Sequence, residues 1–272
     1  MNHIQKYLSM CLIALAALFS AVSMAWAATA PALGTASNFS VLGGTAVTCT
    51  GSVITGDVGT GGIFTDTGCM ISGGMPPATD LAVAGALADF LSAYNILKSN
   101  IATPCTGTLL STITGPMTLP PGVYCTDGAL TGAGVLTLDG GGNTNAVWVF
   151  KIGAAFTGTG FSVVMANGGQ ACNVFWVPSA DVTMTTSALG GNILAGGAGS
   201  ITLTGGTLAG RVLANIAVTM TNANVIGCSA LPPPVFTCKD KDHDMHHHGH
   251  DKDDHDDKGH EHDGKDGKDG KK

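Results

Sequence analysis

Few side chains between Ala28 and Cys228 could carry out acid–base or nucleophilic chemistry, because these 201 residues contain no Glu and no His. Three cations and seven aspartates give the stretch a net charge of −4. They are Lys98, Lys151, Arg211, Asp57, Asp66, Asp80, Asp89, Asp127, Asp139 and Asp181. Asp139 and Asp181 could in principle pair as catalytic carboxylates, but Asp139 lies in the turn sequence LDGGG and Asp181 directly precedes a predicted strand. We therefore expect no enzyme and no cofactor, and so few cations cannot hold nucleic acid by its phosphates.

Histidine is concentrated instead in the last stretch, Lys239–Lys272, which consists mainly of Asp, His, Lys and Gly. This composition predicts disorder. Clustered imidazoles can chelate nickel, zinc or copper. The candidate ligands are His243, His246, His247, His248 and His250. The alternative is a solvating or cell-wall-contacting tail whose metal affinity is incidental.

Threonine forms the most regular pattern of the chain. In Val182–Thr185, Ile201–Thr204 and Val218–Thr221, threonines alternate with Val, Ile, Leu or Met. Because side chains alternate across a strand, the apolar set fills an interior and the threonines point outward. A single threonine is an ordinary surface residue of a strand, but T-x-T pairs on successive strands build a flat array. The candidate binding residues are Thr157, Thr159, Thr183, Thr185, Ser187, Thr202, Thr204, Thr207, Thr219 and Thr221.

Glycine-rich corners separate strands that recur through the second half of the chain. One strand type begins at Val135, Phe161, Val182, Ile201 and Val218. A second type begins at Ala146, Asn173, Asn192 and Arg211, and a third short strand fits near Phe156, Ser187 and Thr207. Coils of about twenty residues with three short faces are typical of a parallel β-solenoid, so we expect a mainly β fold.

One segment departs from this strand pattern. Leu81, Ala84, Ala88, Leu91 and Tyr94 recur at steps of three and four, with Leu87 beside them, which predicts one amphipathic helix over about 79–99. Thr79 can cap its start, Asp80 suits its positive N-terminal end and Lys98 its C-terminal end.

The N-terminus is typical of a secretory signal peptide over residues 1–27. Lys6 precedes an apolar run, and Ala25-Trp26-Ala27 gives the small-x-small pattern read by signal peptidase. An uncleaved anchor is the alternative; no later stretch is judged long and apolar enough to span a membrane. The chain then divides into a body (28–228), a proline-rich linker (229–238) and the tail (239–272).

Cysteine usage agrees with export. Seven cysteines follow the signal peptide without a C-x-x-C motif, which favours disulfides in an oxidising compartment over a zinc ribbon. Local pairing would join Cys49 to Cys69 and Cys105 to Cys125. Cys172 could pair with Cys228, which would leave Cys238 over, but spacing alone does not fix the connectivity.

Longer stretches of the sequence resemble the bacterial and fungal ice-binding protein family. LGTASNFSVLGGTAVTCTGSVITGDVG (33–59) resembles the family's opening, and TLPPGVYCTDGALTGAGVLTLDGGGNTNAVWVFKIG (118–153) its middle signature. GQACNVFWV (169–177) and the GNILA and GRVLA repeats resemble its final coils. The resemblance covers essentially 33–228.

The resemblance implies a right-handed β-solenoid of triangular cross-section, with coils out of sequence order and one long helix packed alongside. It also implies adsorption to ice through one flat face, which in some members carries a T-A/G-x-T/N pattern. Thr204-Gly205-Gly206-Thr207 matches this pattern in full, whereas 157–160 and 221–224 match in part. We expect a secreted monomer, either free or held at the cell surface, with ice as its partner and no membrane or nucleic acid. An extracellular adhesin or structural solenoid is the alternative.

Overall fold

The computed structural model of the chain describes residues 28–109 and 111–228. The expected signal peptide (1–27), linker (229–238) and tail (239–272) lie outside the described residues, as does Cys238.

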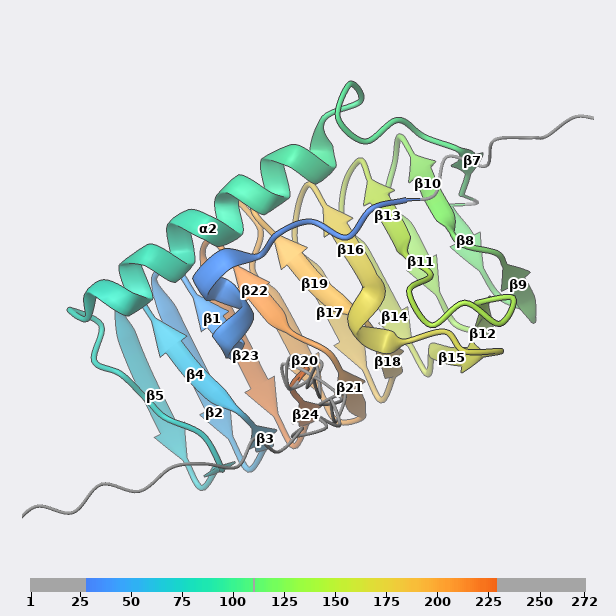
Figure 1. Cartoon of the computed structure of the whole chain (residues 1–272). Helices are drawn as coiled ribbons and strands as arrows, with labels where there is room; N and C mark the ends of the chain where they lie inside the picture. Colours follow the sequence, from blue (N-terminus) through green and yellow to red (C-terminus); the bar gives the residue numbers. More distant parts are fainter. Residues whose placement is uncertain (1–27, 110, 229–272) are drawn as a thin grey trace, which may run out of the picture. The chain divides into compact units, whose positions relative to one another are not determined.

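Three parallel sheets of eight strands form the sides of a solenoid, and each coil contributes one strand to each sheet (Figure 1). Sheet A consists, in order along the stack, of β4 (Asp57–Thr60), β1 (Phe39–Gly43), β22 (Val212–Ala214), β19 (Asn192–Ala195), β16 (Val174–Pro178), β13 (Trp148–Ile152), β10 (Gly122–Thr126) and β7 (Gly107–Thr108). Sheet B consists of β5 (Ile63–Thr67), β2 (Ala46–Thr50), β23 (Ala217–Thr221), β20 (Ile201–Thr204), β17 (Val182–Thr185), β14 (Phe156–Thr159), β11 (Leu130–Gly132) and β8 (Thr112–Ile113). Sheet C consists of β6 (Met70–Ile71), β3 (Val53–Thr55), β24 (Asn224–Ile226), β21 (Thr207–Ala209), β18 (Ala188–Gly190), β15 (Ser162–Ala166), β12 (Val135–Asp139) and β9 (Met117–Leu119).

The coils do not stack in chain order. Strands β1 to β6 form two coils at one end, α2 (Leu81–Lys98) leads to the opposite end, and six further coils wind back until β22 pairs with β1 (Figure 1). A helix of 18 residues is about 27 Å long, whereas the spacings of about 4.8 Å between successive coils of the eight-coil stack add up to about 34 Å. The helix therefore carries the chain along most of the stack, and the expected discontinuous solenoid with one helix is confirmed.

The helix packs on the outer side of sheet A, next to the short helix η1 (Gly34–Asn38) (Figure 1). Its buried side chains form a second core with outward side chains of sheet A, separate from the core inside the solenoid. The helical residues of this core are Val83, Ala86, Phe90, Ala93, Tyr94 and Leu97. The outer side of sheet A is thus covered by the chain itself.

The face of the helix that packs differs from the predicted one. Leu81, which belongs to the predicted stripe, is 86% exposed, and Ala84 and Ala88 are exposed too. Apolar residues surround this helix on most sides, so periodicity could not distinguish the packed face; the bulk of Phe90 and Leu97 against sheet A decides it. By length and composition, this helix is also long and apolar enough to span a membrane, although one side of it packs on sheet A. The expectation that no stretch after the signal peptide would be long and apolar enough is therefore wrong.

The start of the helix also differs in one detail. Asp80 rather than Thr79 is the N-cap residue, and its carboxylate accepts a hydrogen bond from the Ala82 amide at 2.8 Å. Lys98 lies in the last turn as expected.

The assignment of strands to faces is confirmed for one predicted type and wrong for the others. The second type, which includes the strands at Asn173, Asn192 and Arg211, lies entirely in sheet A. The first type mixes two sheets, because the strands at Val135 and Phe161 belong to sheet C and the other three to sheet B. Corners of different length, such as the long connection between β12 and β13, change the spacing of like strands and so concealed the true repeat.

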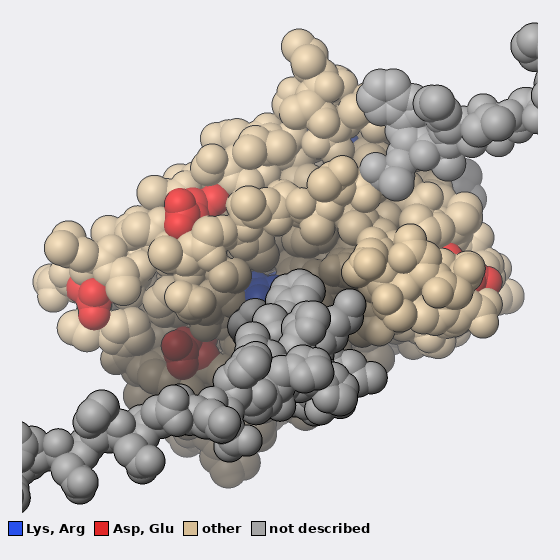
Figure 2. All heavy atoms as spheres, viewed as in Figure 1, with Lys and Arg blue, Asp and Glu red and all other residues tan. Residues whose placement is uncertain are grey.

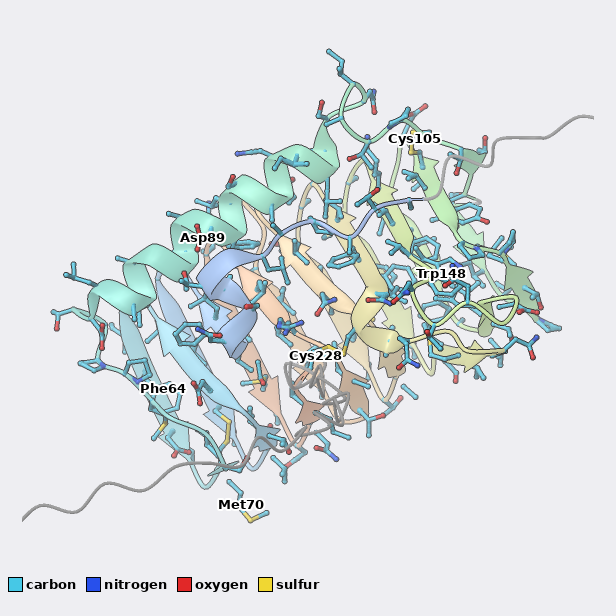
Figure 3. All side chains as sticks on the ribbon, viewed as in Figure 1. Phe64, Met70, Asp89, Cys105, Trp148 and Cys228 are labelled. Atoms are coloured by element: carbon cyan, nitrogen blue, oxygen red, sulfur yellow. A yellow bond between two sulfur atoms is a disulfide. The ribbon has the colours of Figure 1, made fainter. Side chains whose placement is uncertain are left out.

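Both disulfides suggested by local pairing are present, and so is the further pair Cys172–Cys228. Cys49–Cys69 joins the coil of β1–β3 to the terminal coil of β4–β6, and Cys105–Cys125 joins the terminal coil of β7–β9 to its neighbour. Cys105 and Met70, which follows Cys69, lie near opposite ends of the solenoid (Figure 3). Each end of the stack is therefore linked covalently to the coil next to it.

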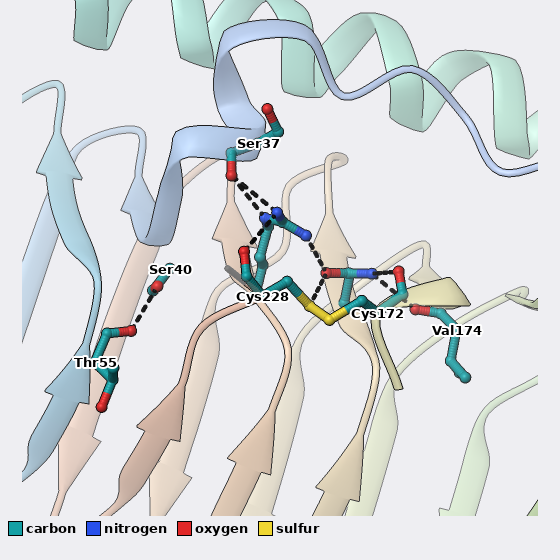
Figure 4. The surroundings of a disulfide bond; sticks show 8 residues. Ser37, Ser40, Thr55, Cys172, Val174 and Cys228 are labelled. Carbon is teal, nitrogen blue, oxygen red and sulfur yellow. Dashed lines mark hydrogen bonds between the residues drawn. A yellow bond between two sulfur atoms is a disulfide. The ribbon is translucent and has the colours of Figure 1, made fainter. Parts of the chain in front are cut away.

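The third disulfide, Cys172–Cys228, joins η2 (Ala171–Asn173) to the segment after β24 (Figure 4). The buried guanidinium of Arg211 lies beside Cys228. That guanidinium donates hydrogen bonds to the Ser37 and Cys228 carbonyl oxygens and to Asn192 Oδ1. Burial lowers the pKa of Arg211. The cation thus fastens η1 and the end of the body to sheet A.

Candidate functional site

The outward side of sheet B carries two straight ranks of threonine. The first rank occupies all eight strands, and the second occupies the six strands from β14 to β5. The first rank is Thr112, Thr131, Thr157, Thr183, Thr202, Thr219, Thr48 and Thr65. The second rank is Thr159, Thr185, Thr204, Thr221, Thr50 and Thr67. All of them are partly or fully exposed, so the two ranks form one accessible surface, the threonine face.

Alternation along the strands produces this surface. In β17 and β20 the residues between the threonines, Val182, Met184, Ile201 and Leu203, are buried in the solenoid core. Neighbouring strands of a sheet lie about 4.8 Å apart, and alternate residues of one strand about 6.6 Å apart. The threonine face is therefore a regular grid with these two spacings.

The grid is also continuous in register and stiff. The pairings within sheet B run in continuous register, whereas the β1–β4 pairing of sheet A shifts between Phe39 and Val41. Threonine has a restricted χ1, because its Cβ is branched. The hydroxyls of Thr131 and Thr157 approach within 3.3 Å across neighbouring strands, which fixes them further.

No charged group of the described residues belongs to either threonine rank. Asp66 is on β5 but pairs in register with the inward-facing Cys49, and its carboxylate accepts a hydrogen bond from the Cys69 amide. Asp181 precedes β17 and accepts one from the Ser200 amide. On the face visible in Figure 2, acidic residues are few and isolated on an otherwise mostly uncharged surface.

Lys98 and Lys151 make hydrogen bonds where α2 and the segment after it meet sheet A. Lys151 donates hydrogen bonds to the Ser99 and Thr103 carbonyl oxygens and to Asn100 Oδ1, just beyond the end of the helix. Lys98 donates to the Ser179 hydroxyl. Burial, reinforced by the charge of Lys98, lowers the pKa of Lys151. These cations are used within the fold, on a different side from the threonine face.

The other two sides lack such a grid. Sheet A is covered by α2 and η1. On sheet C, one outward rank follows the strand pairing and changes residue type at nearly every coil: Val135, Ser162, Ala188, Thr207, Asn224, Val53 and Met70. Sheet B alone presents the same side chain coil after coil.

Eight of the ten predicted binding residues lie together on the threonine face. They are Thr157, Thr159, Thr183, Thr185, Thr202, Thr204, Thr219 and Thr221. Ser187 does not belong there: it is 4% exposed, and its hydroxyl accepts a hydrogen bond from the Phe161 amide and donates one to the Thr185 carbonyl. Thr207 does not either, because Gly205 and Gly206 turn the chain so that Thr204 lies on sheet B and Thr207 on sheet C. The T-G-G-T pattern thus describes the corner between two sheets.

Six residues of the face were missed from the sequence. Thr48, Thr50, Thr65 and Thr67 follow the same T-x-T pattern, but Cys49 and Asp66 stand between them where Met or Leu stands in β17, β20 and β23. Thr112 and Thr131 are single threonines on short strands. The pairs were visible in the sequence, whereas the single threonines needed the register of the coils.

Comparison with known proteins agrees with this architecture. Residues 41–226 match the model of the family described as Ice-binding-like. The chain belongs to this family. It is 41% identical to an ice-binding protein of Nostoc sp. (strain HG1) over 189 residues, which are 68% of this chain and 69% of that protein. It is 32% identical to ice-binding protein K3-B1 of Typhula ishikariensis, covering 66% of this chain and 83% of the relative.

Solved structures of ice-binding proteins share the fold. The ice-binding protein of Antarctomyces psychrotrophicus superposes with a TM-score of 0.69 at 33% identity, covering 74% of this chain and 100% of that one. An ice-binding protein of a Flavobacteriaceae bacterium gives 0.69 at 38% identity, covering 75% of this chain and 48% of that one.

Metal binding was predicted outside this region. The five candidate histidines of the tail lie outside the described residues, so their role stays a prediction. Within residues 28–109 and 111–228, no group of three or more His, Cys, Asp or Glu side chains could hold a metal ion.

Proposed function

We propose that this chain adsorbs to ice through the threonine face and thereby slows ice growth and recrystallisation. The observation that carries the proposal is the pair of unbroken threonine ranks in register on sheet B. The membership of the chain in the ice-binding family, and the ice-binding proteins among its relatives, support it.

The chemistry of the face suits a crystal of water. Ice presents a periodic lattice without charge or pockets, so a binder gains from a flat, repeated and moderately polar surface. Each threonine offers a methyl group, which orders neighbouring water, and a hydroxyl, which can hydrogen-bond to it. A stiff side chain loses little rotamer entropy when it is held against the lattice. Many weak contacts made together by a rigid grid can then hold a crystal surface.

The proposal includes no catalysis. Asp139 and Asp181 are the two carboxylates that could have paired, but Asp139 stabilises its own turn and Asp181 accepts a hydrogen bond from the Ser200 amide on the neighbouring coil. Asp139 accepts hydrogen bonds from the Gly141 amide and Asn167 Nδ2, which lower its pKa. A carboxylate held in its charged form by such partners is poorly suited to act as a general acid. Export through the expected signal peptide, with ice outside the cell as the partner, is part of the same proposal and is supported by three disulfides.

The experiment is to grow single ice crystals and to follow recrystallisation in the presence of the purified full-length protein. We expect facetted crystals and arrested coarsening of the grains. Albumin at equal mass is the control for unspecific effects of protein. Coarsening indistinguishable from that in albumin would contradict the proposal.

A further inference from the structure

A left-handed residue follows each threonine of the second rank, at the corner where the chain leaves sheet B. These six residues are Gly160, Thr186, Gly205, Asn222, Gly51 and Gly68, with φ between 46° and 74°. The amides of the first five continue the hydrogen bonding of the sheet, each donating to the carbonyl oxygen of the second-rank threonine on the next coil. The corner therefore has one conformation, repeated in register from coil to coil.

Glycine suits this corner, and four coils use it. Thr186 (φ 46°) and Asn222 (φ 52°) are the exceptions. Residues other than glycine are disfavoured in the left-handed region. Asn is tolerated there better than most residues, whereas a β-branched Thr is a genuine outlier. Backbone strain of this kind persists where a side chain serves a function.

Nothing within the described part of the fold accounts for the two side chains. Both residues are exposed, and neither side chain makes a hydrogen bond there. Asn167 shows the contrast: among the described residues it is the third non-glycine residue with positive φ, and its Nδ2 donates to Asp139 Oδ2 at 2.9 Å. A local partner explains Asn167 but neither corner residue.

The corner position faces open space beside the threonine grid. A Cβ atom added at Gly160 or Gly68 would meet no atom within 4 Å, whereas one added at Gly51 would lie 2.6 Å from Asn222 Oδ1, the side chain of the neighbouring corner. One added at Gly205 would lie 3.5 Å from Thr186 Cγ2, so side chains at neighbouring corners would be neighbours in one rank. The corner thus provides a third rank parallel to the two ranks of the threonine face, occupied in two coils.

We propose that Thr186 and Asn222 are ice-contacting residues that extend the threonine face around its edge, and that the chain accepts backbone strain for this purpose. This inference rests on the proposed function. Thr186 adds a further methyl and hydroxyl, and Asn222 an amide that can donate and accept hydrogen bonds with lattice water. Ice adsorption therefore depends on two side chains that do not contribute to the stability of the fold.

The test compares Thr186→Gly, Asn222→Gly and the double variant with the unchanged full chain. Glycine relieves the left-handed strain, so the melting temperature should stay the same or rise. The concentration needed for half-maximal recrystallisation inhibition should nevertheless rise about threefold to tenfold in the double variant, as expected for the loss of one or two net hydrogen bonds. Asn167→Gly is the matched control, because it relieves the same kind of strain away from the threonine face and should leave ice activity unchanged.

Thr202→Tyr, in the middle of the first rank, separates the two proposals. Loss of activity in this variant, with full activity in the double glycine variant, would overturn the third rank and leave the threonine face intact. Full activity in both would overturn the proposed function as well. A fall in activity after Asn167→Gly equal to that in the double variant would also overturn the inference, because the effect would then come from corner flexibility.

Discussion

Threonine at an outward position of a strand combines a methyl group, a hydroxyl and a restricted χ1 in a small side chain. Such a residue binds little by itself. On sheet B its effect comes from repetition, since one threonine lies opposite the next in up to eight consecutive strands. A single bulky replacement should therefore disturb more contacts than its own.

Thr204 and Thr207 provide a direct test of which side binds ice, because they are three residues apart on different sheets. Tyr at 204 places a ring on the threonine face and should lower ice activity about tenfold or more by lifting neighbouring threonines from the lattice. Tyr at 207 places the same ring on sheet C and should leave activity unchanged. Both side chains are exposed, so the free energy of unfolding should change by no more than about 0.5 kcal/mol.

Ser162→Tyr, also outward on sheet C, is a second control. Ice activity and thermal melting followed by circular dichroism are measured for all three variants. Equal loss from the substitutions at 204 and 207, with melting unchanged, would show that ice contact is not confined to sheet B.

At the scale of residues, the sequence showed which threonines point outward better than it showed which threonines lie side by side. The T-x-T pairs of β17, β20 and β23 identified outward threonines without any structure, because alternation is a local property of a strand. Which threonines share a side is a property of the corners. The left-handed Gly205 and Gly206 between Thr204 and Thr207 make the difference, and periodicity does not reveal where such a turn ends one sheet and begins the next.

At the scale of elements, the solenoid has two ends where coils are paired on one side only. Each coil of a repeat protein is stabilised mainly by its neighbours, so the terminal coils are the first to open. Cys49–Cys69 links one terminal coil to its neighbour, and Cys105–Cys125 links the other terminal coil to its own neighbour. Each disulfide joins cysteines 20 residues apart in the chain. Of the two terminal coils, the one of β4–β6 carries a threonine of both ranks, Thr65 and Thr67, whereas the other carries only Thr112.

Replacing both cysteines of either pair with Ala should lower stability by about 3 kcal/mol, the amount expected for a loop of this length. Hydrogen exchange should become faster in β5 for Cys49→Ala/Cys69→Ala, and in β8 for Cys105→Ala/Cys125→Ala, while β17 and β20 stay protected. Ice activity should fall more in the first variant, because two threonines of the grid then lie on a loosened coil. Unchanged exchange in β5 would contradict the role of that disulfide as an end link.

Elements could be predicted only in part. The presence, length and C-terminal lysine of α2 followed from apolar periodicity and from the residues at its ends, but its packed face did not, since Leu81 and Phe90 are both apolar and only sheet A selects between them. The closing of the stack by β1 between β4 and β22 depends on contacts between residues far apart in the chain. No local pattern carries that information, and the resemblance to known proteins supplied it.

At the scale of the whole body, charge and contact are divided among three sides. The helix, η1 and all three cations of the body contact sheet A. The threonine face of sheet B has no charged side chain in its ranks. A charged group there would hold mobile water more strongly than lattice water, so this division suits adsorption to a neutral crystal.

Deleting the tail tests whether ice adsorption depends on the body alone. The eight histidines that follow the body all lie between residues 239 and 272, so deletion of this stretch should abolish retention on nickel resin. It should leave ice shaping and recrystallisation inhibition unchanged at equal molar concentration, because the two threonine ranks lie entirely within 48–221. Metal chelation and ice adsorption would then be separate properties of one chain.

Replacement of His243, His246, His247, His248 and His250 with Asn in the undeleted protein is the matched control, since it removes the first imidazoles and keeps the length and formal charge of the tail. A loss of ice activity in the deleted protein but not in the substituted one would show that the tail assists adsorption through its length or charge.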